Sequence, residues 1–269
     1  MKKVHFIFFI TSSILITSCN FSNKFNIIGD NNIIYGKVKF ITELEYEMNF
    51  KFDELQIDKP SRITYYWFNE RGNLIKEKEI GLYRLSDSLL YEYDLNNKLI
   101  KKNDFYRGKK SSFNYHYKEN LLVDEIEHLN DSIIKKTIYE YSNLNKKRKG
   151  RYMKGNNEKI IITEFDDNGN KTSERTYNNE GTTRENSYQY SYNEKGLLLS
   201  SKEDYSSGVE YTYNKKNLKI SKKDAITTCK NYEYEDFDRY GNWLKLEYYY
   251  EFYSGEGHRY LIERKIKYY

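Results

Sequence analysis

One short pattern returns about every two dozen residues from position 62 onward, and it constrains the fold more than any other feature. Each clear copy has an aromatic residue, then Asp or Asn, and Gly or Asn four positions after the aromatic. Successive aromatic residues are 25, 24, 24, 24, 27, 21 and 24 positions apart. A fixed period of this size indicates a repeat architecture. The copies begin at Phe68, Tyr93, Tyr117, Tyr141, Phe165, Tyr192, Tyr213 and Phe237, and those at Tyr117, Tyr141 and Tyr213 are weaker.

Each repeat predicts a β-hairpin. Aromatic and polar residues alternate before the turn, as in Leu90-Tyr91-Glu92-Tyr93, and a period of two is typical of a strand. Gly169 and Gly196 supply the positive φ that a tight turn requires. Residues 36–269 are therefore expected to form a single all-β domain, in which about eight tandem hairpins build a continuous antiparallel, twisted sheet or a short open solenoid with atypical first and last units. Valine should be costly at Gly196 and tolerated at Gly81, outside the turns.

The aromatic residues should form two columns on one face of the sheet. Residues i and i+2 of a strand share a face, and equivalent positions of neighbouring hairpins lie side by side. The chain has 30 Tyr, 14 Phe and a single Pro, which favours strands over helices. A tyrosine ring can pack while its hydroxyl stays hydrated. The second column lies two residues before the first, at Tyr66, Tyr91, Tyr115, Tyr139, Tyr190 and Tyr211.

The first residues predict export and a lipid anchor. Lys2 and Lys3 precede an apolar run that is too short for a transmembrane helix and typical of a signal peptide, residues 1–18. Ile16-Thr17-Ser18-Cys19 resembles a bacterial lipobox. The resemblance implies that Cys19 is acylated and that residues 19–35 are a spacer between the lipid and the sheet. An ordinary signal peptide followed by a chance cysteine is the alternative.

Catalytic signals are weak throughout the chain. His116, His128 and His258 lie in separate repeats, and Cys229 has no cysteine or histidine partner nearby in sequence. No phosphate loop, nucleophile elbow or zinc-protease motif is present. The spacing from Asp236 to Glu247 imitates a calcium loop, but strands are expected on both sides of it. We expect no enzymatic activity, no metal and no cofactor.

Positive charge is concentrated in one short run, Lys146-Lys147-Arg148-Lys149, within a chain of formal net charge +5. In a cytoplasmic protein such a run near aromatic residues would suggest nucleic acid binding. Export argues against nucleic acid as a partner. The remaining interpretations are a contact with an anionic glycan or lipid phosphate and, more simply, a solvated turn.

Two segments resemble a known repeat family. Tyr91-Glu92-Tyr93-Asp94 and Asp166-Asp167-Asn168-Gly169-Asn170 are similar to the two halves of the YD, or RHS, repeat. The start and close of the domain also resemble small lipoproteins of the Bacteroidota. The resemblance implies strips of β-hairpins that can curl into shells, with a suggested role in carbohydrate binding. Lys118, Ser142 and Glu235 depart from the pattern, since they replace its acidic or amide residue.

These observations lead to two hypotheses for a non-catalytic, lipid-anchored envelope protein. In the first, exposed tyrosines stack on the sugar rings of a polysaccharide. In the second, the tyrosines pack the sheet, and the protein is a structural or protein-interaction scaffold in the envelope. Cys19 is followed by no acidic stretch, so the periplasmic leaflet of the outer membrane is favoured over the cell surface. The candidate stacking residues are Tyr93, Tyr117, Tyr141, Tyr192 and Tyr213.

Overall fold

The fold consists of β-strands joined by turns. The computed structural model describes residues 25–27, 32–51, 54–57, 59–81, 88–142, 146–154, 157–178, 184–204, 208–224, 227–252 and 257–269. Every helix or strand element within these ranges is a strand, which confirms the predicted all-β class. No helix in the described part of the chain has the length and apolar character needed to cross a membrane. The predicted signal peptide and Cys19 lie outside the described residues.

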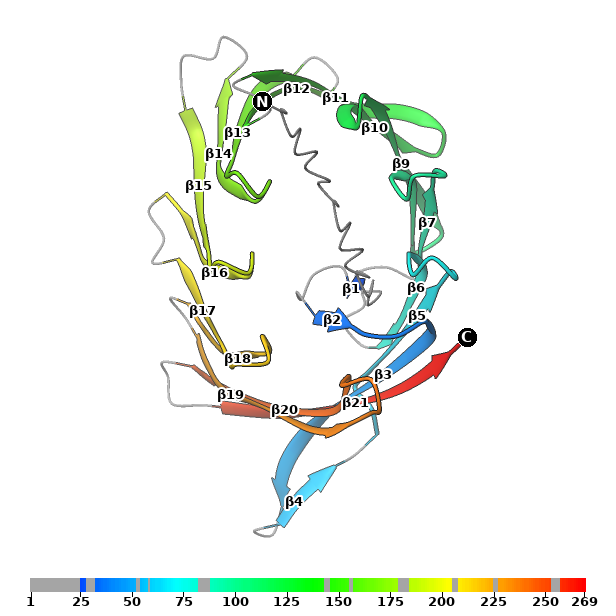
Figure 1. Ribbon diagram of the computed structural model, residues 1–269, viewed down its shortest axis with the longest axis vertical. Helices are drawn as coiled ribbons and strands as arrows, with labels where there is room; N and C mark the ends of the chain where they lie inside the picture. The colour runs from blue at the N-terminus through cyan, green and yellow to red at the C-terminus, as the bar shows by residue number, and fades with distance from the viewer. Residues whose placement is uncertain are drawn as a thin grey trace, which may run out of the picture.

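Eighteen strands form one antiparallel wall. In chain order they are β3 (Val38–Lys51), β5 (Arg62–Phe68), β6 (Leu74–Gly81), β7 (Ser88–Tyr93), β8 (Leu99–Tyr106), β9 (Lys109–Lys118), β10 (Leu121–Leu129), β11 (Ser132–Ser142), β12 (Lys147–Lys154), β13 (Asn157–Phe165), β14 (Lys171–Asn178), β15 (Arg184–Tyr192), β16 (Leu198–Glu203), β17 (Val209–Tyr213), β18 (Lys219–Lys223), β19 (Thr227–Phe237), β20 (Trp243–Phe252) and β21 (Gly257–Tyr268). A separate pair, β1 (Phe25–Ile27) and β2 (Asn32–Ile34), lies inside the ring, and β4 (Glu54–Ile57) extends the far end of β3 (Figure 1).

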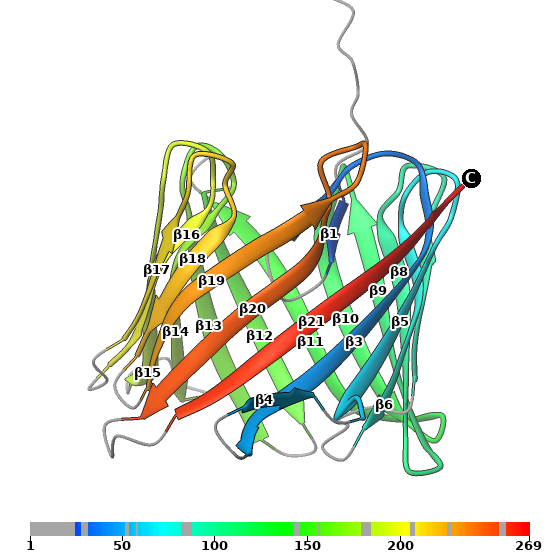
Figure 2. The ribbon, with the colours of Figure 1, turned by 90° about the horizontal axis from the view of Figure 1, so that it is seen from below.

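The predicted continuous antiparallel sheet is confirmed, and its two ends pair, so that the wall is a closed barrel and not the short open solenoid that was the other expectation. β3 pairs with β5 on one side and with β21 on the other, from Met48–Arg259 to Val38–Tyr268. The strands run obliquely around the barrel (Figure 2). An open sheet would leave the unpaired N–H and C=O groups of two long edge strands in solvent. Pairing the first and last strands removes both edges, and this explains why these units lack the repeat signature.

The repeated motif builds the same turn six times. The side-chain Oδ1 of the turn's first Asp or Asn accepts hydrogen bonds from the backbone N–H groups two and four residues later. In the turn after β13, Asp166 Oδ1 is 2.9 Å from the Asn168 nitrogen and 2.8 Å from the Asn170 nitrogen. An Asx side chain that satisfies backbone donors in this way specifies a turn locally. The capping residues are Asn69, Asp94, Asp166, Asn193, Asn214 and Asp238.

The fourth turn residue adopts the left-handed conformation predicted for it. Its φ is +79° at Gly169 and +76° at Gly196, and asparagine takes the same place at Asn97 and Asn217 with φ of 63° and 64°. The expectation for Gly81 is wrong. A Cβ at this position would lie 2.9 Å from the Ser61 carbonyl oxygen of the neighbouring strand, because the backbones of β5 and β6 meet there. Valine at Gly81 would therefore clash.

The buried core lies against the lumen face of the wall. Ile34 of β2 is fully buried against Ile41, Tyr66, Phe68 and Tyr91, from strands β3, β5 and β7. Since β2 lies inside the ring (Figure 1), these side chains point into the lumen. Strand alternation then places both aromatic columns on the lumen face. A second cluster, Trp243, Leu246 and Tyr248, continues the core along β20.

A buried asparagine fastens the segment before β3 to the turn between β19 and β20. Asn242 is 2% exposed, and its Oδ1 accepts a hydrogen bond from the Tyr35 N–H at 2.7 Å. Its Nδ2 donates to the Tyr35 carbonyl and to the Tyr268 hydroxyl, each at 2.9 Å. The Tyr268 hydroxyl in turn donates to the Asp238 carboxylate. The Asn242 side chain therefore joins three parts of the barrel: the residue before β3, the last strand β21, and the turn between β19 and β20.

We expect Gly169→Val to destabilise the protein by about 1–2 kcal/mol, because a β-branched side chain is unfavourable at positive φ. A Cβ at Gly169 would meet nothing within 4 Å, so the loss measures backbone strain alone. Gly169→Asn is the control and should cost much less, since Asn97 and Asn217 occupy the equivalent position. Urea denaturation gives both values. Equal losses for Val and Asn would contradict the assigned turn conformation.

We expect Asn242→Ala to lower the free energy of unfolding by about 1–3 kcal/mol, because it leaves the Tyr35 N–H and C=O without partners. Asn170→Ala is the matched control. Asn170 has the same place in its own turn, and its Nδ2 donates to the Asp166 carboxylate at 2.9 Å, within that turn. The midpoint of urea unfolding should fall more for Asn242→Ala. A fall of the same size in both variants would show that the Tyr35 contact does not stabilise closure.

Candidate functional site

The five tyrosines predicted to stack on sugars all lie on the lumen face, and four of them donate their hydroxyl to a backbone carbonyl of a preceding strand. Tyr192 is partly buried on the same face. Each recorded bond ties a ring to its neighbouring hairpin, so packing is one established role of this column. The bonds join Tyr93 to Leu74 (2.9 Å), Tyr117 to Leu99 (3.0 Å), Tyr141 to Leu122 (3.0 Å) and Tyr213 to Leu198 (2.9 Å).

The predicted basic run is divided between the two faces of β12. Strand alternation directs Arg148 into the lumen and Lys147 and Lys149 to the outside, so the four residues do not form one anion-binding patch. The Arg148 guanidinium lies over two aromatic rings, which is a cation–π arrangement. The recorded partners are the rings of Tyr139 (4.5 Å) and Phe165 (5.3 Å) for Arg148, Asp167 for Lys146, and Glu164 (3.8 Å) for Lys147.

The lumen face also carries a series of tyrosine–glutamate pairs that the sequence analysis did not single out. In each pair a tyrosine hydroxyl donates to a glutamate carboxylate on an adjacent or nearby strand. Each carboxylate keeps further lone pairs, and each phenol oxygen can still accept a hydrogen bond. The pairs are Tyr66–Glu43 (3.3 Å), Tyr91–Glu77 (3.4 Å), Tyr139–Glu125 (3.2 Å), Tyr188–Glu203 (2.9 Å) and Tyr248–Glu45 (3.1 Å).

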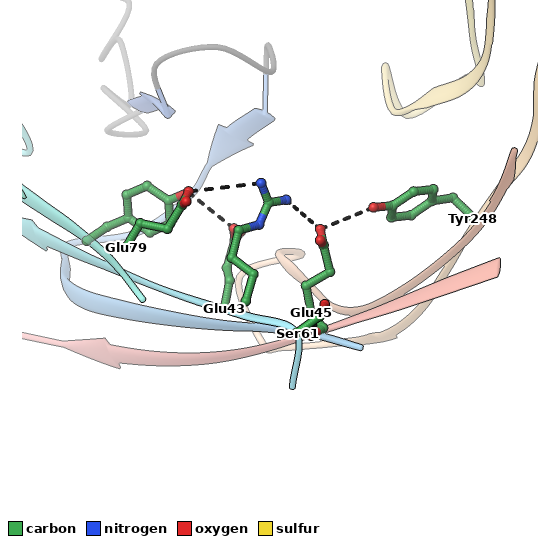
Figure 3. A network of polar contacts seen from close by, with 7 residues as sticks. Glu43, Glu45, Ser61, Glu79 and Tyr248 are labelled. Carbon is green, nitrogen blue, oxygen red and sulfur yellow. Dashed lines mark hydrogen bonds and ion pairs between the residues drawn. The ribbon is translucent and has the colours of Figure 1, made fainter. Parts of the chain in front are cut away.

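Two of these pairs, Tyr66–Glu43 and Tyr248–Glu45, lie where the barrel closes. Figure 3 shows Glu43, Glu45, Glu79 and Tyr248 projecting from the wall into the lumen. Glu45 accepts from the Tyr248 hydroxyl and, at 2.5 Å, from the guanidinium of Arg62. Four strands, β3, β5, β6 and β20, therefore contribute side chains to one polar network.

A buried arginine extends the network along β21. The Arg264 side chain is 1% exposed, its Nε donates to Glu43 at 2.6 Å, and its guanidinium lies 3.3 Å from the centroid of the Trp243 ring. The Nη1 atom of Arg264 is buried without a hydrogen-bond partner among the described residues. A buried donor of this kind is costly to leave unsatisfied.

A row of stacked rings runs beside this network on β19, β20 and β21. Tyr248 stacks on Tyr232 at 5.7 Å and on Tyr260 at 5.1 Å, with interplanar angles of 22° and 16°. His258 stacks on Tyr260 at 6.4 Å and lies 2.9 Å from Glu47. The rings face one another, so they present mainly their edges and hydroxyl groups to the lumen. Such edges offer hydrogen bonds more readily than flat stacking surfaces.

A cleft of about 340 Å³ lies at one end of this row. Tyr232 and Phe237 contribute aromatic walls, and Leu218 contributes an apolar side chain. Asn214, Lys215 and Lys216 supply polar groups from the turn between β17 and β18. A concave, mostly apolar surface with a few polar groups is the usual form of a small-ligand site.

Burial raises the pKa of several tyrosines on the lumen face. It is the main cause that raises the pKa of Tyr66 and Tyr91 well above 10, and neighbouring carboxylates raise it further. The same effects raise the pKa of Tyr115 to about 12. Burial also raises the pKa of the Glu77 carboxyl, against the hydrogen bond from Tyr91 that lowers it. At neutral pH the tyrosine hydroxyls therefore remain hydrogen-bond donors along the lumen.

The three histidines among the described residues occupy separate sites. His116 pairs with Asp124 on the outer face at 2.5 Å, His128 contacts Asn114, and His258 faces Glu47 across the closing strands. Among the residues described, no group of three or more His, Cys, Asp or Glu side chains is placed to hold a metal ion. The side chain of Cys229 lies outside the described residues.

Comparison with known proteins gives resemblances of fold only. No protein-family model and no curated protein sequence matches the chain. A porin-like protein from Bacteroides uniformis matches with 9% identity and a TM-score of 0.43, over 86% of this chain and 98% of that one. A mutant Tc holotoxin pore of Photorhabdus luminescens matches with 15% identity and a TM-score of 0.35, over 76% of this chain and 12% of that one. A TcdB2–TccC3 structure matches with 11% identity and a TM-score of 0.28, over 81% and 14%.

Proposed function

We propose that the protein is a non-catalytic, lipid-anchored envelope protein that binds a saccharide along the lumen face of its barrel. The observation that carries this proposal is the series of tyrosine–glutamate pairs on the lumen face. A barrel of 16–18 strands is too wide for its own side chains to fill, so its interior holds water. The pairs therefore face a space that a hydrated polymer can enter.

The chemistry of the pairs suits sugar hydroxyl groups. A sugar hydroxyl can donate to the free lone pairs of a glutamate and accept from a partly exposed guanidinium such as that of Arg62. Tyrosine ring edges offer apolar contact to the C–H groups of the same sugar. Because the pairs occur at five places on the lumen face, an extended polysaccharide can make several similar contacts, and their combined effect exceeds that of any one.

The outer face of the barrel has the charge pattern of a surface in water, and this supports a protein that is attached to a membrane through a lipid. Ion pairs cross this face between neighbouring strands, and charged side chains of both signs are typical of a surface in water. We therefore propose that the protein is held at the periplasmic leaflet of the outer membrane by an acyl group on Cys19. The cross-strand pairs include Lys101–Glu92 (3.8 Å), Arg151–Glu158 (3.3 Å) and Lys245–Glu235 (2.9 Å).

A scaffold role in the envelope is the second candidate. The observation in its favour is the use of the column tyrosines within the fold: their hydroxyls bind backbone carbonyls, and cations cover some aromatic faces. Lys98 lies 5.2 Å from the Tyr117 ring centroid, and Lys171 lies 4.6 Å from that of Tyr190. Rings covered in this way are less open to a sugar, and under this alternative the protein would bind another envelope protein.

A saccharide array and titration calorimetry with the mature chain separate the two functions. The lumen variant is Tyr188→Phe with Glu203→Gln, which removes hydrogen-bonding capacity with little change in shape. The control is Ser191→Ala with Ser200→Ala, an outward hydrogen-bonded pair (2.7 Å) on the same two strands. We expect saccharide binding that weakens by about tenfold in the lumen variant only, as loss of hydrogen bonds worth about 1.4 kcal/mol would produce. An array without binding, together with a reproducible protein partner, would support the scaffold.

We expect Cys19→Ala to abolish metabolic labelling of the protein with a palmitate analogue, because an alanine has no thiol to carry the lipid. Cys229→Ala is the control and should leave the labelling unchanged. Labelling that persists in Cys19→Ala and disappears in Cys229→Ala would contradict the proposed attachment site.

A further inference from the structure

Three large apolar or aromatic side chains are exposed at one end of the barrel. Leu95 in the turn between β7 and β8 is 85% exposed, Tyr240 in the turn between β19 and β20 is 41% exposed, and Tyr269 after β21 is 50% exposed. The β19–β20 turn and the end of β21 lie at the same end of the barrel (Figure 2). A single exposed apolar side chain is ordinary, but several at one end of a molecule point to an interaction surface.

Each of the three has a cationic side chain beside it. The Nη1 atom of Arg71 donates to the Leu95 carbonyl at 3.0 Å. The guanidinium of Arg239 lies 4.8 Å from the Tyr240 ring centroid, and Lys39 Nζ lies 5.4 Å from that of Tyr269.

The outer wall just below this end continues the same combination. By strand register Lys76, Trp67, Phe40 and Lys267 are cross-strand neighbours on β6, β5, β3 and β21. The Phe40 and Trp67 rings are 5.1 Å apart, and Lys76 Nζ lies 4.9 Å from the Trp67 ring centroid. Within the described part of the chain neither lysine has a recorded carboxylate partner. We call this surface the aromatic–basic rim. It consists of Lys76, Trp67, Phe40 and Lys267 on the wall, and of Leu95, Tyr240 and Tyr269 with Arg71, Arg239 and Lys39 beside them.

We propose that the aromatic–basic rim docks onto the surface of an anionic phospholipid membrane. Tyrosine and tryptophan favour the headgroup region of a bilayer, an exposed leucine can enter its apolar boundary, and lysine and arginine are attracted to anionic lipids. The rim thus orients the barrel with this end toward the membrane.

The path of the chain agrees with a membrane at this end of the barrel. Tyr35, just before β3, is hydrogen-bonded to Asn242 beside the turn that carries Tyr240, so the segment leading back to Cys19 reaches the barrel at the rim. Phe25 of β1 pairs with Ile34, next to Tyr35, and the six positions from Cys19 to Phe25 span at most about 22 Å when extended. The inference rests on the lipid attachment proposed for Cys19, but docking without the lipid is measurable separately.

A projecting leucine distinguishes a membrane from a soluble polyanion. The 85% exposed side chain of Leu95 has nothing to offer an acidic polysaccharide, whereas a bilayer can bury it. Lysines and flat rings alone would suit either occupant.

The test is co-sedimentation of the mature chain from Asn20 onward, which contains every described residue and lacks the lipid. The vesicles are phosphatidylcholine alone and phosphatidylcholine mixed with phosphatidylglycerol. We expect binding to the mixed vesicles, weakened at least about tenfold by Lys76→Gln, Arg239→Gln and Lys267→Gln together. Leu95→Ser should weaken it by about tenfold as well. The control is Lys109→Gln, Lys110→Gln and Lys154→Gln, the same charge change at the opposite end.

Tryptophan fluorescence gives a second readout. Trp243 is 3% exposed, so a blue shift on vesicle binding should come from Trp67 and disappear in Trp67→Phe. Equal binding by the rim variant and the control, or no binding of the parent protein to mixed vesicles, would overturn the proposal. Binding to polygalacturonate that depends on the same lysines, without binding to vesicles, would also overturn it in favour of a polyanion site.

Discussion

Main-chain pairing between β3 and β21 holds together segments more than 200 positions apart in sequence, and the geometry of the lumen depends on it. Each hairpin of the repeat can form from local information, through its alternating strands and its Asx-capped turn. The ring exists only because ten residue pairs, from Met48–Arg259 to Val38–Tyr268, join its two ends. Three contacts of the candidate site are assembled across this junction: Arg264 with Glu43, His258 with Glu47, and Tyr248 with Glu45. Opening it would separate these three pairs of side chains.

The local features of the fold could be predicted because the interactions that determine them are local in sequence. Asp166 and its equivalents bond backbone groups only two and four residues away, and Gly169 adopts the positive φ that its place in the turn requires. Closure could not be predicted, since it depends on the twist accumulated over all the hairpins. Gly81 was misjudged for a related reason: the atom that forbids a side chain there belongs to Ser61, on the neighbouring strand.

The candidate site was only partly visible in the sequence. Tyr66, Tyr91 and Tyr139 stood out by their period, but their glutamate partners look like the polar half of any strand. Glu43 lies in a unit without the repeat signature and meets Tyr66 only through the register of β3 with β5. The clustering of aromatic residues at 248–250 was a signal, because Tyr248 lies at the centre of the stacked row. Burial and cross-strand register decide which carboxylates face a tyrosine, and neither can be inferred from the sequence of a single strand.

The hydrogen bonds from column tyrosines to carbonyls of the preceding unit have a consequence for how such a ring can change in size. Tyr93, Tyr117, Tyr141 and Tyr213 each bind the hairpin before them, so a hairpin recognises its predecessor and not a fixed location on the circumference. Duplication or loss of one unit would leave every remaining joint intact and would leave β3 and β21 with the same partner surfaces. The circumference can therefore vary in steps of two strands, and the bore of the ring can be enlarged or reduced by recombination without redesign of its junction.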